Sequence, residues 1–347
     1  TSAEGEAVVD RDSKRIAMFR SGSTGFSLVI VDYSKVAEEK VYSLPSSTAY
    51  RSPRWSPDSR YLAFESRLGL SKAEIQLFDP DRGGEPRVIA EVTGQTRGLA
   101  WLPDGSGLVY SSSEGSTMAY PPLFNLRVVD IESGRDTPLP CDTGGYASFV
   151  EPDISRAGKL VASRVAIESD IFKYPVVIGS PRENVDNAKR ITRQTGLVQV
   201  PSASPSGDQV AYLSNRGGRA NIWVTSVADP DNPRRLTNEQ DPDVIIGLPL
   251  WSPTDDLITY WRGPPNSKAE QCLVPPDGNE QLRRRLVQCR GGAAWSRDGE
   301  WLYYIASTDD PRTTTMEKVP VAGGVAKPVL DKAAGLTIAR DGKTGFF

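Results

Sequence analysis

The chain has 347 residues, of which 38% are apolar and 24% are charged, and its formal net charge at pH 7 is −3. This composition is typical of a folded, soluble protein and argues against an intrinsically disordered chain. The balanced charge gives no reason to expect a nucleic-acid partner, and no apolar run approaches the roughly 18–20 residues that a membrane span needs.

Histidine is absent from the sequence. Ser-His-Asp and Cys-His catalytic systems both need an imidazole, so neither can be assembled from this chain alone. Histidine-ligated zinc and non-haem iron are excluded for the same reason. No GxSxG motif and no marked pair of catalytic carboxylates is visible. We therefore expect a protein that is not an enzyme, with no catalytic residues, no metal and no cofactor.

The elements that we expect, in chain order, come from one repeated pattern. An apolar residue ends a first strand, a Ser-Pro-Asp-Gly-like turn follows, and a second strand of β-branched, aliphatic and aromatic residues comes next. A third strand follows about ten residues later, and a second turn leads to a fourth. The apolar residues that open the pattern are Val9, Trp55, Trp101, Ile154, Ala203, Trp251, Trp295 and Ile338.

Successive patterns are 43 to 53 residues apart. A period in the forties made of short strands is typical of β-propeller blades. We predict an all-β fold, a single β-propeller domain over residues 1–347 built from four-stranded antiparallel blades. The predicted repeat units lie near 5–45, 50–90, 97–140, 147–192, 198–237, 246–287 and 290–330, with a partial unit at 335–347. They allow seven or eight blades, and the complete N-terminal unit favours eight.

Four tryptophans and the turn aspartates are best explained by this architecture. A blade cannot bury both of its faces alone, so Trp55, Trp101, Trp251 and Trp295 are expected to pack between blades. Asp12, Asp58, Asp104, Asp298 and Asp341 lie in the turns and lack the dense spacing of a calcium loop, so we expect them to stabilise the turn backbone.

The three cysteines are Cys141, Cys272 and Cys289, and none forms a CxxC pair. This odd and sparse set argues against a disulfide framework. A turn expected at 276–279 would place Cys272 nearer Arg283 than Cys289. A Cys272–Cys289 disulfide is therefore the less favoured alternative.

Three segments carry a family resemblance: WSPDSRYLAFES at 55–66, ASPSGDQVAYLSNRGGRANIWVTS at 203–226, and WSRDGEWLYYIAS at 295–307. They resemble the repeat of TolB-type, WD40-like β-propellers, and the likeness extends over essentially the whole chain. The order of blades is most similar to the propellers attached to bacterial regulators and kinases. The resemblance implies an extracytoplasmic or periplasmic location and further domains in a longer parent chain. TolB itself differs, because it has six blades and an added α/β domain.

Loops and arginines at one mouth of the predicted toroid are the candidate binding features. The loops 111–124, 261–269 and 306–315 are long and varied, and such loops on a rigid scaffold often bind partners. An arginine follows the second strand of five repeats, and the connections between repeats add Arg51, Arg54 and Arg97. These side chains form either a basic funnel for a carboxylate or phosphate, or ion pairs with neighbouring blades. The candidate ligand- or partner-binding residues are Arg20, Arg51, Arg67, Arg97, Arg164, Arg216 and Arg262.

Three functions agree with these features. The first is a non-catalytic scaffold that binds a protein or peptide, as the sensory part of a larger bacterial protein. The alternative is the substrate-gating half of a prolyl oligopeptidase-type serine peptidase whose hydrolase domain lies outside this chain. A weaker alternative is a histidine-free carbohydrate-active enzyme, which would need two acidic residues facing each other roughly 5–10 Å apart.

Overall fold

The computed structural model divides into two compact units. Unit 1 comprises Thr1–Ser116 and Pro122–Ala166, and unit 2 comprises Thr117–Pro121 and Ile167–Phe347. The boundary therefore falls inside the predicted fourth repeat, 147–192, and each unit is described by itself. The structure describes residues 6–22, 25–35, 38–45, 49–69, 72–116, 122–141, 147–194, 196–241, 244–254, 256–264, 269–279, 282–306, 314–331, 337–338 and 345–346.

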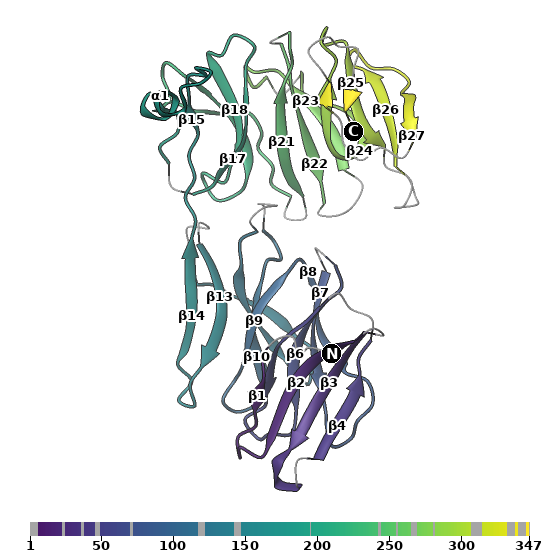
Figure 1. Cartoon of the computed structure of the whole chain (residues 1–347). Helices are drawn as coiled ribbons and strands as arrows, with labels where there is room; N and C mark the ends of the chain where they lie inside the picture. The colour runs from purple at the N-terminus through teal and green to yellow at the C-terminus, as the bar shows by residue number, and fades with distance from the viewer. Residues whose placement is uncertain are drawn as a thin grey trace. The chain divides into compact units, whose positions relative to one another are not determined.

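Unit 1 contains three four-stranded antiparallel sheets followed by a two-stranded pair (Figure 1). The first sheet is β1 (Val8–Val9), β2 (Arg15–Gly22), β3 (Gly25–Asp32) and β4 (Glu38–Ser43), with a 3-10 turn at Tyr33–Lys35. The second is β5 (Ala49–Trp55), β6 (Leu62–Arg67), β7 (Lys72–Phe78) and β8 (Arg87–Thr93). The third is β9 (Thr96–Trp101), β10 (Gly107–Ser112), β11 (Asn125–Asp130) and β12 (Asp136–Leu139), and β13 (Ala147–Ile154) pairs with β14 (Leu160–Ala166).

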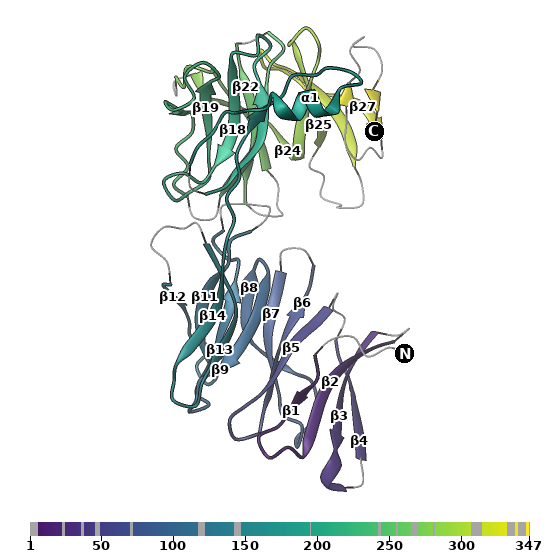
Figure 2. The ribbon, with the colours of Figure 1, turned by 60° about the vertical axis from the view of Figure 1, so that its left-hand side comes forward.

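Unit 2 begins with a two-stranded pair, β15 (Phe172–Lys173) and β16 (Lys189–Arg190), separated by the short helix α1 (Pro181–Asp186) (Figure 2). A four-stranded sheet follows: β17 (Val198–Ala203), β18 (Gln209–Ser214), β19 (Asn221–Ser226) and β20 (Arg234–Arg235). A seven-stranded sheet comprises β21 (Ile245–Trp251), β22 (Ile258–Gly263), β23 (Ala269–Val274), β24 (Arg284–Trp295), β25 (Trp301–Ala306), β26 (Thr315–Pro320) and β27 (Lys327–Asp331). The last pair is β28 (Thr337–Ile338) with β29 (Gly345–Phe346).

The predicted propeller class is confirmed, since the described strands form successive antiparallel sheets in sequence order, four of which have four strands. Two details differ from the expected repeat units. The outer strand of the unit 246–287 and the inner strand of the unit 290–330 form one continuous strand, β24, because the connection between them stays extended. The helix α1 was not expected from the sequence, although Pro181 at its first turn is a common helix start.

Apolar residues pack between neighbouring sheets, as expected for blades that share their cores. In unit 1 one cluster joins Phe19 and Leu28 of the first sheet to Leu62 and Phe64 of the second. The rings of Phe19 and Phe64 meet edge to face, with centroids 5.4 Å apart. The predicted inter-blade role is confirmed for three tryptophans, whose indole groups donate to a carbonyl of the preceding blade: Trp55 to Val8, Trp101 to Arg54 and Trp295 to Leu250. The buried Trp251 indole makes no hydrogen bond within the described residues.

The turn chemistry agrees with the prediction at Asp58, Asp104 and Asp298, whereas in the first turn Asp10, and not Asp12, accepts the amides of Lys14 and Arg15. The Asp58 carboxylate accepts hydrogen bonds from the Ser56 hydroxyl at 2.5 Å and the Arg60 amide at 3.1 Å. Asp298 makes the same two contacts in its own turn, and Asp104 caps Ser106. The turn at Asp341 lies outside the described residues.

The inner strand of most repeats carries one β-bulge in a left-handed backbone conformation. The residues concerned, with their φ angles, are Ser52 (51°), Gly98 (92°), Glu151 (54°), Val200 (51°), Leu248 (51°) and Gly291 (80°). Each coincides with a shift in strand register. A proline follows the bulge residue at Pro53, Pro152, Pro201 and Pro249. Positive φ is rare for a branched residue such as Val200. The paired strand residues before and after each bulge must therefore hold it in place.

Candidate binding cavity

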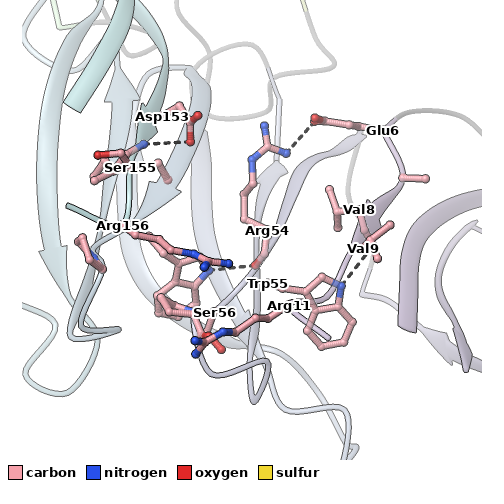
Figure 3. Close-up of a pocket in the computed structure, with 16 residues that line it drawn as sticks. Glu6, Val8, Val9, Arg11, Arg54, Trp55, Ser56, Asp153, Ser155 and Arg156 are labelled. Carbon is pink, nitrogen blue, oxygen red and sulfur yellow. Dashed lines mark hydrogen bonds and ion pairs between the residues drawn. The ribbon is translucent and has the colours of Figure 1, made fainter. Parts of the chain in front are cut away.

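A cavity of about 690 Å³ lies in unit 1, where the inner strands β1, β5, β9 and β13 end in their turns (Figure 3). All of its lining residues belong to unit 1. It lies at the end of the strands where the Ser-Pro-Asp-Gly-like turns are, whereas the predicted arginines were placed at the opposite end. None of the seven predicted arginines lines it.

One repeat position contributes a lining residue from each of the four repeats. Two residues after the apolar residue that opens the pattern, the chain has Arg11, Pro57, Pro103 and Arg156, and all four line the cavity. The turns fix this position, since the Ser13 amide donates to the Asp10 carbonyl at 3.0 Å and the Gly158 amide donates to the Ser155 carbonyl at 2.9 Å. The wall thus has two rigid proline rings between two arginines.

The guanidinium groups of the cavity differ in their partners. Arg54 pairs with Glu6 at 2.9 Å and also donates to the Pro53 carbonyl at 2.8 Å. Arg11 donates through its side chain to the Pro57 carbonyl at 3.4 Å, and among the described residues it has no carboxylate partner. Arg156 is exposed and likewise has no ion pair there. Figure 3 shows these two side chains extending into the cavity from opposite sides.

The apolar wall is formed by two indole rings that are held in place. The Trp55 Nε1 donates to the Val8 carbonyl at 3.3 Å, and the Trp101 Nε1 donates to the Arg54 carbonyl at 3.0 Å. The guanidinium of Arg15 stacks over the Trp55 ring, 4.5 Å from its centroid. Both rings therefore present fixed surfaces to a ligand.

The hydroxyl groups of the cavity are poor candidates for catalysis. The Ser56 hydroxyl donates to Asp58, and this hydrogen bond, outweighing the opposing effect of burial, lowers the pKa of Asp58 below its ordinary value. A carboxylate with a lowered pKa is a weak general base. The Ser155 hydroxyl accepts from the Lys159 amide at 3.0 Å. These contacts build the turns at the ends of the strands.

The seven predicted arginines are spread over both units and have several kinds of partner. Three contact a carboxylate: Arg20 with Glu39 at 2.8 Å, Arg97 with Glu151 at 4.0 Å, and Arg262 with Glu239 at 2.7 Å and Glu270 at 3.6 Å. Of the others, Arg67 donates to Gln95, Arg216 stacks on Trp223, Arg51 lies opposite Glu65, and Arg164 lies opposite Phe149. The ion-pair alternative expected an acid of the neighbouring blade, and of these pairs only Arg97–Glu151 joins one sheet to the next, since Arg20 and Glu39 belong to the same sheet. A binding role stays a prediction.

Parts of the predicted binding loops lie outside the described residues, namely 117–121, 265–268 and 307–313. Among the predicted arginines that pair with a carboxylate, Arg262 has the most buried partner, Glu239. The Glu239 carboxylate also accepts hydrogen bonds from the Gln240 and Asp241 amides.

Glu65 is a buried acid that the sequence analysis did not select. It is 4% exposed and occupies a position that is Phe19, Leu213, Trp261 or Ile305 in other repeats. Its carboxylate accepts from the Ser52 hydroxyl and the Gly98 amide, each at 2.8 Å, so it joins the bulges of β5 and β9. Burial raises the pKa of Glu65, and the hydrogen bonds from Ser52, Gly98 and Thr96 oppose this. Two further repeats have Ser111 and Arg164 at this position, so the repeat pattern alone did not mark Glu65 as unusual.

All three cysteines are free, as favoured from the sequence. Cys272 lies opposite Arg285, two residues from the predicted neighbour, and Cys289 lies opposite Ala269. Burial raises the pKa of Cys289 to about 12. Among the described residues no helix is long and apolar enough to cross a bilayer.

No protein-family model matches the chain. A curated relative, the uncharacterized protein Atu1656 of Agrobacterium fabrum, is 28% identical over 216 residues, which cover 60% of this chain and 68% of the relative. Solved structures similar to the chain include TolB from Acinetobacter baumannii, with 16% identity, a TM-score of 0.32, and coverage of 90% of this chain and 62% of TolB. A prolyl endopeptidase structure has 15% identity, a TM-score of 0.37, and coverage of 94% of this chain and 49% of the peptidase.

The chain thus spans less than two thirds of either solved structure. Similarities this distant say nothing about activity. The propeller class rests on the strand order and pairing of the chain itself.

Proposed function

We propose that this chain is a non-catalytic β-propeller that binds a protein or peptide in the cavity of unit 1. The observation that carries the proposal is the convergence of four successive repeats on one cavity of about 690 Å³. Its volume falls within the range of roughly 300–1,000 Å³ that is usual for ligand sites and would hold a few residues of a peptide.

The character of the walls supports binding. Two fixed indole rings and two proline rings offer apolar surface without a large loss of side-chain entropy. Two exposed arginines, Arg11 and Arg156, offer polar recognition at the rim. The serines of the cavity are engaged in turns, and the chain lacks histidine, which favours a binding role over an enzymatic one.

The resemblance of the repeats to TolB-type propellers supports an extracytoplasmic location and a place within a larger bacterial protein. In that setting the propeller would act as the sensory or scaffolding part. Fractionation of cells that express the parent gene tests the location, and recovery of the protein in the cytoplasmic fraction would contradict it.

A peptide-display selection with a blocked variant tests the binding function. A random peptide library is selected on the immobilised chain and counter-screened on Ala7→Trp, since Ala7 is an exposed lining residue and an indole there occupies the cavity. Val325→Trp, at an exposed site in unit 2, is the matched control. We expect peptides that bind the unaltered chain and the control but not Ala7→Trp. Peptides that bind all three proteins equally would contradict a site in this cavity.

A further inference from the structure

The charges of the cavity specify its ligand more closely, provided that the proposed binding function is correct. The cavity has five charged side chains: Arg11, Arg54, Arg156, Glu6 and Asp153. Glu6 neutralises Arg54 at 2.9 Å. The Asp153 carboxylate accepts from the Ile154 amide at 2.9 Å, and it has no ion pair within the described part of the chain. Two unneutralised guanidinium groups therefore face one unneutralised carboxylate.

The positions of the two arginines follow from the repeat and not from chance surface exposure. The same turn position is proline at Pro57, Pro103, Pro205 and Pro253 and arginine at Arg11, Arg156, Arg297 and Arg340. In the two repeats at the ends of the unit 1 cavity it is arginine. The same turn position thus lines the cavity with a proline in the two middle repeats and with an arginine in the outer two. Figure 3 shows the side chains of Arg11 and Arg156.

We propose that the cavity binds a carboxylate-bearing peptide segment, with Arg11 and Arg156 pairing the carboxylate and the Pro57 and Pro103 rings supporting its apolar neighbours. Guanidinium forms charge-assisted, two-pronged hydrogen bonds with carboxylate. Its pairing is stronger beside the indole and proline surfaces than in open water, because these surfaces exclude solvent. A carboxylate is supplied either by an acidic side chain or by the C-terminus of a chain.

The indole N–H groups of Trp55 and Trp101 provide a site-specific measurement, because both are hydrogen-bonded to backbone that borders the cavity. Their NMR signals in the isotope-labelled full chain are followed during titration with three peptides. The first is acetyl-Gly-Ala-Leu-Asp-Leu-Ala-Gly-amide. The second has Asn in place of Asp, and the third has that Asn with a free C-terminal carboxylate. The signals of the other tryptophans serve as internal controls.

We expect a carboxylate peptide to shift the two indole signals and to bind about tenfold more tightly than the neutral peptide. Arg11→Gln and Arg156→Gln should each weaken that preference, whereas Arg297→Gln, at the same turn position in unit 2, should not. Preference for the first peptide identifies a side-chain carboxylate, and preference for the third identifies a C-terminus.

The failures are distinguishable. Equal binding of the neutral and charged peptides, or a preference unchanged in both variants, overturns the carboxylate inference and leaves the binding function standing. If none of these peptides and none from the display selection shifts the two indole signals, the binding function itself is wrong. Folding of each variant is checked by the remaining tryptophan signals.

Discussion

Replacing Glu65 by glutamine separates the shape of this buried side chain from its charge. The carboxylate accepts from Ser52 and Gly98 at 2.8 Å each, and the pKa of Glu65 is raised above its ordinary value of 4.5, chiefly by burial. Because the unfolded chain releases this proton at a lower pH than the folded chain, ionisation of Glu65 favours unfolding. Its protonated form contributes stability that is complete below pH 4.5 and is lost as the pH rises through the folded-state pKa.

Glutamine keeps an acceptor for the Gly98 amide and removes the charge. We expect Glu65→Gln to lie within about 1 kcal/mol of the unaltered chain at low pH. It should become relatively more stable as the pH rises above 4.5, at most by about 1.4 kcal/mol per pH unit. Glu65→Ala leaves the buried Gly98 and Ser52 donors without an acceptor and should cost about 2–4 kcal/mol.

Amide hydrogen exchange at Gly98 measures the effect locally, with the variants compared at the same pH so that intrinsic exchange cancels. Urea unfolding followed by tryptophan fluorescence gives the global value. The quantity to follow is the free energy of unfolding of Glu65→Gln minus that of the unaltered chain. If this difference stays constant or falls as the pH rises, the reasoning is refuted.

Three further predictions concern single sites. Gly98→Ala should destabilise unit 1 by about 2–4 kcal/mol in urea unfolding, because φ is +92° and a Cβ would lie 2.7 Å from the Glu151 Cα. Gly158→Ala, where φ is +76° and the surrounding space is open, should cost only about 1 kcal/mol. Equal losses of stability in the two variants would contradict the steric argument. Arg262→Ala should lower the free energy of unfolding by about 2 kcal/mol, because it leaves the Glu239 carboxylate, which is 7% exposed, without its cation. Arg20→Ala removes a more exposed ion pair and should lower it by less than about 0.5 kcal/mol. The reverse order would favour a binding role for Arg262. In the native chain a thiol reagent should modify the exposed Cys141 and spare the buried Cys272 and Cys289, and all three should react after denaturation. Rapid reaction of two or more cysteines in the native chain would show that the β23–β24 core opens.

Features that depend on residues near in sequence could be predicted, and features that depend on convergence could not. The strand alternation and the turn chemistry around Asp58 are local, so the repeat and its sheets followed from the sequence. The tryptophans were assigned to the space between blades because a blade cannot bury both of its faces alone, and the indole hydrogen bonds of Trp55, Trp101 and Trp295 agree.

The extended connection that makes β24 continuous had no sequence signal, since Val287–Gly292 would suit a bend equally well. The cavity was missed because Arg11 and Arg156 are far apart in sequence and each alone resembles a solvated turn residue. The shared repeat position gave only a weak signal, since it is proline in four repeats and arginine in four. Glu65 could not be predicted as a buried acid, because other repeats have both apolar and polar residues at its position and its partner Gly98 lies in a bulge of the next repeat.

The proline that follows several of the bulges restricts how a partner can be held. An inner strand has one unpaired edge, and an extended peptide commonly binds such an edge by adding a strand through main-chain hydrogen bonds. At Pro53, Pro152, Pro201 and Pro249 the edge lacks an amide donor and the register is interrupted by the preceding residue. These strands are thus poor templates for β-augmentation, and a guest must be recognised through its side chains or its terminus. Affinity should then depend strongly on peptide sequence and little on extended backbone conformation.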